Sequence, residues 1–168
     1  MAEHVDHDRP DRLQHLLGRG SWDTDGVGDD LREFVVAHLG DRDGVRVVDE
    51  TGDLKKGAAT VGVQRQHTGT AGRIENAQGA VYLTYAASTG HAMIDRELHL
   101  SKSWTSDPAR CAAAGVPAEV EFTTKPALAG DMIVRAIDAG VPARWVGGDE
   151  VYGDNPTLSL AYNPAGPG

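Results

Sequence analysis

Two aspartates in this sequence occupy positions where carboxylates can do metal chemistry. Asp49 follows the β-branched run Val45–Val48, and Asp149 follows a second strand-like run, Ala143–Val146, after two glycines. Ligands of mixed sheets gather at the carboxyl ends of strands. If the two strands are neighbours, both carboxylates converge on one edge of the sheet although they are 100 residues apart.

Convergent carboxylates suit Mg²⁺ or Mn²⁺, which prefer oxygen ligands and take one or two carboxylates together with substrate phosphate oxygens. Such ions can activate a water and stabilise a leaving oxygen, so the pattern favours phosphodiester chemistry. The alternative is structural, because an Asp after a strand commonly forms a turn or caps a helix. Glu50 and Glu150 could also form an acid–base pair for glycoside hydrolysis, but nothing in the sequence suggests a sugar-binding platform.

The charge distribution indicates where an anionic partner would bind. With 16 basic and 25 acidic residues the net charge is −9, which argues against a protein that coats nucleic acid non-specifically. The segment 54–74 nevertheless carries no acidic residue and four basic ones, Lys55, Lys56, Arg65 and Arg73. We expect an anionic partner such as DNA to approach there; ordinary solvated surface charge is the alternative.

Several other classes lack their signals. The GxGxxG, GxxxxGK[ST] and GxSxG motifs are absent, and the single Cys111 excludes an internal disulfide framework. No apolar run of about 18 residues is present, and the acidic start of the chain does not fit a secretory signal. We expect a cytoplasmic protein that does not enter a membrane.

Periodicity and punctuation predict a mixed α/β sheet with packed helices. Helices are expected over 23–39, with Leu31, Phe34, Val35 and Leu39 on the packed face, between Asp107 and Gly115, and between Pro126 and Gly140. Strands are expected over 45–48, 59–66, 80–87, 91–99 and 143–146, with a long polar loop over 68–78. Strands in one block, followed by a helix, a strand and an expected further helix, favour a mixed α/β sheet with helices packed on it.

A series of short motifs follows the first aspartate. They are VDETG (48–52), KKG (55–57), GVQRQ (62–66), GTAG (69–72), NAQ (76–78), DREL (95–98), SW (103–104), TKP (124–126) and GDEVYG (148–153). In this order they resemble the DDE-type transposases of bacterial insertion sequences, in the DDE superfamily endonuclease group, over most of residues 21–153.

The resemblance implies an RNase H-like fold in which an Asp, Asp and Glu triad binds two divalent ions, Mg²⁺ or Mn²⁺. It implies that Asp49 and Asp149 are the first two acids, and that Lys55, Lys56, Arg65 and Arg73 lie beside transposon-end DNA. Similar enzymes hydrolyse the phosphodiester at an element's end and use the freed 3′-hydroxyl to attack target DNA.

The sequence departs from this family at its two ends. No third catalytic acid is identified, because only Glu150 and Asp154 follow Asp149, and from about Ser159 the likeness ends. The usual amino-terminal DNA-binding region is also mostly missing. We expect a partly disordered arm over 1–20, a C-terminally incomplete catalytic domain over 21–157 and a disordered tail over 158–168.

The sequence therefore favours a transposase-family protein that is an inactive or truncated remnant. One alternative is a DNA-binding or interfering fragment that associates with a full-length transposase or with itself. Another is an unrelated carboxylate hydrolase, whose activity would be indifferent to loss of Lys55 and Arg65.

Overall fold

The computed structural model describes residues 11–18 and 20–153. The chain forms two compact units, residues 1–30 and 31–168. In the first, helix α1 spans Asp11–Gly18 and helix α2 (Thr24–Leu39) begins, continuing into the second. The predicted start of α2 is confirmed: the Asp23 carboxylate accepts a hydrogen bond from the Gly26 N–H at 3.0 Å. Most of the expected arm and all of the expected tail lie outside the described residues.

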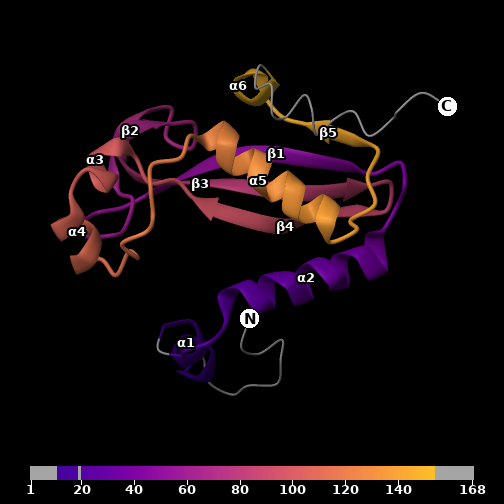
Figure 1. Cartoon of the computed structure of the whole chain (residues 1–168), viewed down its shortest axis with the longest axis horizontal. Coiled ribbons are helices and arrows are strands. Elements are labelled where there is room, and N and C mark those ends of the chain that lie inside the picture. Colours follow the sequence, from indigo (N-terminus) through magenta and orange to yellow (C-terminus); the bar gives the residue numbers. More distant parts are fainter. Residues whose placement is uncertain (1–10, 19, 154–168) are drawn as a thin grey trace. The chain divides into compact units, whose positions relative to one another are not determined.

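The second unit is built on a five-stranded sheet in the order β2-β3-β1-β5, with β4 also paired to β3 (Figure 1). The strands are β1 (Val45–Leu54), β2 (Gln64–Thr68), β3 (Arg73–Ala87), β4 (Gly90–Leu98) and β5 (Trp145–Gly147). The β1–β5 pair is parallel and the other pairs are antiparallel. The predicted mixed α/β fold is confirmed.

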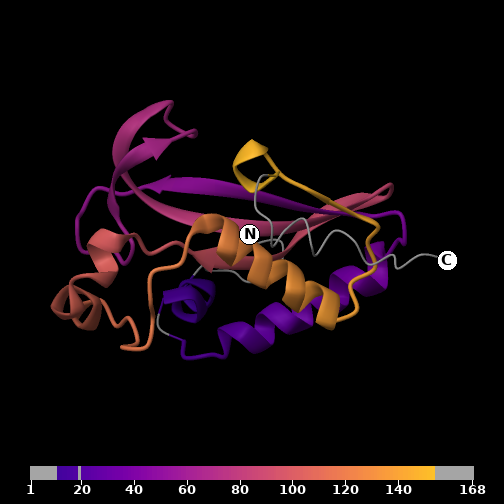
Figure 2. The same cartoon turned by 45° about the horizontal axis from the view of Figure 1, so that its top comes forward.

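Three strand predictions need correction. β1 does not end before Asp49 but continues to Leu54, because β3 remains its partner along its whole length. Of the strand expected over 59–66, only residues 64–66 are in a strand; they form the start of β2, and residues 59–63 are not part of a strand. The loop expected over 68–78 is a hairpin with its turn at 69–72, and it rises away from the rest of the sheet (Figure 2). The sequence does not predict this part of the hairpin because its polar residues lack the alternation of apolar and polar side chains that marks a half-buried strand.

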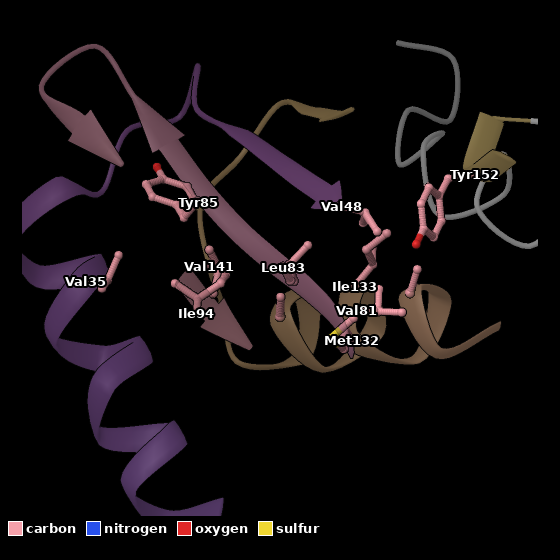
Figure 3. Close-up of a cluster of buried hydrophobic side chains, with 12 residues drawn as sticks. Val35, Val48, Val81, Leu83, Tyr85, Ile94, Met132, Ile133, Val141 and Tyr152 are labelled. Atoms are coloured by element: carbon pink, nitrogen blue, oxygen red, sulfur yellow. The ribbon is translucent and has the colours of Figure 1, made fainter. Parts of the chain in front are cut away.

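Helix α5 (Lys125–Asp138) covers one face of the sheet, with Pro126 near its start and Gly140 just past its end, as predicted (Figure 1). Its fully buried residues are Ala129, Met132, Ile133 and Ala136. They join Val48 of β1 and Val81, Leu83 and Tyr85 of β3 in the main core (Figure 3). Ile137, near the end of the same helix, is 43% exposed and lies outside this core.

The face predicted for α2 is wrong in part. Leu31 and Phe34 are exposed, while Val35 and its neighbour Arg32 are the buried positions. The Arg32 guanidinium lies 3.7 Å from the buried Asp95 carboxylate of β4. A charged residue thus occupies a buried position of the helix, and hydrophobic periodicity does not detect it.

A second apolar cluster packs Trp104 against Val63 and Leu100. The Trp104 indole N–H donates to the Val63 carbonyl at 2.8 Å. Helices α3 (Lys102–Thr105) and α4 (Pro108–Ala113) surround it, the latter confirming the predicted short helix, and α6 spans Glu150–Gly153. No helix in the described part of the chain is both long and apolar enough to cross a bilayer.

Candidate active site

The two aspartates lie in equivalent positions along neighbouring parallel segments, Asp49 within β1 and Asp149 just beyond the end of β5. Val47 of β1 is opposite Gly147 of β5, and this is the last pair between the two strands. Asp49 and Asp149 each lie two residues beyond it. After this point no described strand pairs with the β5-facing edge of β1, so the sheet opens where the two acids are.

Gly148 allows the segment that carries Asp149 to pass close to β1. A Cβ at this position would lie 3.2 Å from the Tyr152 Cβ and 3.5 Å from the Val48 carbonyl oxygen. A larger residue would therefore push Asp149 away from β1 or displace Tyr152.

A cleft of about 390 Å³ occupies this open edge. It is lined by β1, the β2–β3 hairpin, the first residue of α5 and the segment after β5, with the residues Asp49, Glu50, Thr51, Gly52, Gln66, His67, Thr68, Gly69, Thr70, Gly79, Lys125 and Asp149. Gly52 lets the hairpin fold over β1, because a Cβ there would lie 2.5 Å from the Thr68 hydroxyl oxygen. That hydroxyl donates to the Gly52 carbonyl at 3.2 Å.

Both aspartates are exposed to the cleft and only partly engaged. Asp49 Oδ1 accepts from the Glu50 N–H at 2.7 Å, and Asp149 Oδ1 accepts from the Val151 N–H at 3.0 Å, which also gives Asp149 the turn-forming role considered above. Within residues 11–18 and 20–153 neither carboxylate forms an ion pair. Their remaining oxygen lone pairs are the donors that Mg²⁺ and Mn²⁺ prefer.

Of the three acids that line the cleft in the described part of the chain, two, Asp49 and Asp149, form no ion pair there. No group of three or more His, Cys, Asp or Glu side chains in the described part of the chain is arranged to hold a metal. Glu50 lines the same cleft, but its carboxylate forms an ion pair with the Lys125 ammonium at 2.7 Å. Glu50 is therefore no substitute for a third ligand.

The Tyr152 hydroxyl lies close to the acidic side chains of the cleft. Burial raises the pKa of Tyr152, and the charges of Glu50, Asp149 and Asp49 raise it further because a phenolate would face three carboxylates. The neutral hydroxyl donates to Glu50 Oε2 at 3.4 Å.

The four predicted DNA-binding residues lie outside the cleft lining. Lys55 and Lys56 follow β1, Arg65 is on β2, and Arg73 begins β3 with its guanidinium 2.8 Å from the Glu75 carboxylate. Lys56, Arg65 and Arg73 are exposed. The structure thus places them on the hairpin and on the turn after β1, not around the aspartates.

Sequence reasoning missed Lys125, the lysine that does line the cleft. One signal for it existed. Lys125 opens a helix, directly after the N-cap Thr124, where the helix dipole favours acidic residues instead.

Comparisons with known proteins identify the family of the chain. The family model described as DDE superfamily endonuclease matches residues 1–165, and the chain therefore belongs to this family. The chain is also 27% identical over 157 residues to a protein of Microchaete diplosiphon described as a probable transposase for insertion sequence element IS701. That match covers 92% of this chain and 38% of the relative, so the chain spans well under half of the relative's length. No solved structure matches it.

Proposed function

We propose that this chain carries the divalent-metal and DNA-binding part of a transposition reaction, in which the phosphodiester at an insertion-sequence end is cleaved and joined to target DNA. The observation that carries the proposal is the common register of Asp49 and Asp149 beyond the last β1–β5 pair. Membership of the DDE superfamily endonucleases makes nucleic acid the favoured substrate over that of an unrelated carboxylate hydrolase.

Each part of the site has a distinct role in this proposal. Asp49 and Asp149 would hold Mg²⁺ or Mn²⁺ through carboxylate oxygens; such an ion supplies Lewis-acid stabilisation and a more acidic water. The basic residues of the hairpin and turn, Lys55, Lys56, Arg65 and Arg73, would contact DNA phosphates outside the cleft. The cleft between hairpin and β1 orients one strand over the two acids.

We further propose that the described part of the chain does not complete the reaction alone, because the third acid at the cleft, Glu50, is paired with Lys125. The purified chain should bind a duplex more tightly with Mn²⁺ than with a chelator, and Asp49→Asn should remove this stimulation. Strand-joining products should be absent from gels. Metal stimulation that survives Asp49→Asn would contradict the site, and efficient joining by the unaltered chain would contradict its incompleteness.

A second candidate is a DNA-binding or interfering fragment that associates with a full-length transposase. The exposure of Lys56 and Arg65 away from the cleft favours it, since they can contact DNA whether or not catalysis occurs. In this case adding the chain to a full-length transposase should inhibit transposition in vitro, and the Lys56→Ala/Arg65→Ala double variant should inhibit less. Equal inhibition by both, or none by either, would exclude this role.

A further inference from the structure

Lys125 occupies a position that helix stability does not explain. It is the first residue of the 14-residue helix α5, whose N-cap Thr124 accepts a hydrogen bond from the Ala127 N–H at 3.3 Å. The helix N-terminus carries partial positive charge, and an acidic side chain there is stabilising whereas a cation is not. α5 has no acidic residue in its first turn. A charged lysine at this site therefore needs another reason.

The Lys125 side chain is held in the cleft. Its ammonium lies 2.7 Å from Glu50 Oε2, with the two side chains 25% and 39% exposed. The same Glu50 oxygen accepts from the hydroxyl of Tyr152, a residue that is 2% exposed and belongs to the main core (Figure 3). Glu50 therefore links the ammonium to a fixed group, and the lysine does not range freely over the surface.

This arrangement leaves donor capacity for a ligand. A lysine ammonium has three N–H donors, and the contact with Glu50 uses one. The ammonium is partly exposed and lines the same cleft as Asp49 and Asp149. A phosphodiester strand that crosses the two aspartates would bring a non-bridging oxygen to a donor that is already oriented.

We propose that Lys125 binds a DNA phosphate in the cleft and that Glu50 is a positioning residue that holds its ammonium there. This inference rests on the proposed function, because it takes a DNA strand at Asp49 and Asp149 as the ligand. It assigns a phosphate contact to the cleft itself, apart from the four basic residues of the hairpin and turn.

Fluorescence anisotropy of a labelled DNA duplex at graded salt, with Mn²⁺ present, tests the contact. Lys125→Ala should weaken binding roughly tenfold and reduce the slope of log K against log[salt] by about 0.9, the value for one lost phosphate contact. Lys125→Arg should retain most of the affinity. The matched control is Lys102→Ala, since Lys102 lies over the Phe122 ring outside the cleft lining and should leave both quantities unchanged.

A second readout separates loss of a contact from loss of structure. Mn²⁺ binding, followed by electron paramagnetic resonance without DNA, should become tighter in Lys125→Ala because a cation is removed from beside the ion. A folding defect would instead weaken both DNA and Mn²⁺ binding, and that outcome in Lys125→Ala and Lys125→Arg alike would overturn the proposal.

The positioning role of Glu50 is tested by its coupling to Lys125. Glu50→Asp keeps the negative charge, but its shorter side chain moves the carboxylate away from the Lys125 ammonium. This variant should weaken DNA binding severalfold when Lys125 is present, and should have no such effect when combined with Lys125→Ala. Equal effects in both backgrounds would remove the positioning role. If Lys125→Ala binds DNA as Lys102→Ala does while metal-stimulated binding persists, the inference fails and the proposed function stands. If the unaltered chain shows no metal-stimulated binding, both fail.

Discussion

The two halves of β1 show how one strand serves stability and chemistry in turn. Val45–Val47 pair with β3 on one edge and with β5 on the other, and Val48 is buried in the main core. From Asp49 onward the described strands pair with β1 at its β3 edge alone, and most of its side chains are exposed. Where a strand pairs on both edges, its backbone hydrogen bonds and side chains contribute to the sheet and the core. Where one partner strand ends, polar side chains remain available to a ligand.

The largest loss of stability is expected from substitutions in the core beneath the doubly paired part of the sheet. Leu83 of β3 is fully buried beneath α5, so Leu83→Ala should reduce the free energy of unfolding by about 2–5 kcal/mol through lost burial and a residual cavity. Urea unfolding followed by circular dichroism measures this. Asp49→Asn, at the open end, should change stability by no more than about 0.5 kcal/mol. A similar loss in both variants would break the distinction between the two regions.

The ion pairs of Asp95 give the next effect. Its carboxylate is 4% exposed, 3.7 Å from the Arg32 guanidinium and 3.0 Å from that of Arg135. Asp95→Asn should reduce the free energy of unfolding by about 2–3 kcal/mol. This loss is smaller than that expected on breaking a fully buried ion pair, because Arg135 is partly exposed. The control, Asp43→Asn, removes the exposed partner of Arg144 and should fall within about 0.5 kcal/mol of the unaltered chain. A loss in Asp95→Asn no larger than the control's would contradict the role of burial.

At the boundary between the two halves, Gly148→Ala should affect ligand binding more than stability. Its Cβ would press on the Tyr152 Cβ at 3.2 Å, so the Asp149 segment should move and Mn²⁺ affinity should fall severalfold, with a loss of no more than about 1 kcal/mol in unfolding free energy. Gly57→Ala, where no atom lies within 4 Å of the added Cβ, is the matched control. Isothermal titration calorimetry measures the Mn²⁺ affinity of both variants. Equal affinities would contradict the role of Gly148 in placing Asp149.

The smallest effect concerns pH. Burial lowers the pKa of His99, and the nearby Lys125 lowers it further. The folded chain then binds fewer protons than the unfolded one, so stability should fall as the pH drops below about 6.5, the unfolded value, toward the lowered one. His99→Gln should flatten this part of a thermal unfolding profile. An unchanged decline would show that His99 does not contribute.

Much of the frame was predictable because its signals are local. Asp23, Pro108, Pro126 and Gly140 mark helix ends, and the helices lie there in the structure. The convergence of Asp49 and Asp149 also followed from two strand-like runs once they were taken as neighbours.

The remaining features depend on tertiary contacts. The first residues of β3 are polar and form a hairpin that rises from the sheet, so no alternation reveals them. Arg32 is buried because Asp95, 63 positions later in the chain, provides its charge partner. Lys125 reaches the cleft only because α5 begins beside Glu50. No spacing along the sequence expresses these pairings.

The central claim is that Asp49 and Asp149 share one divalent ion, and a double-mutant cycle on Mn²⁺ affinity tests it most directly. If the site is shared, Asp49→Asn and Asp149→Asn should each weaken binding by roughly tenfold or more, and the double variant should bind little worse than either single one. Near-normal affinity in either single variant, or fully additive losses in the double variant, would contradict a shared site.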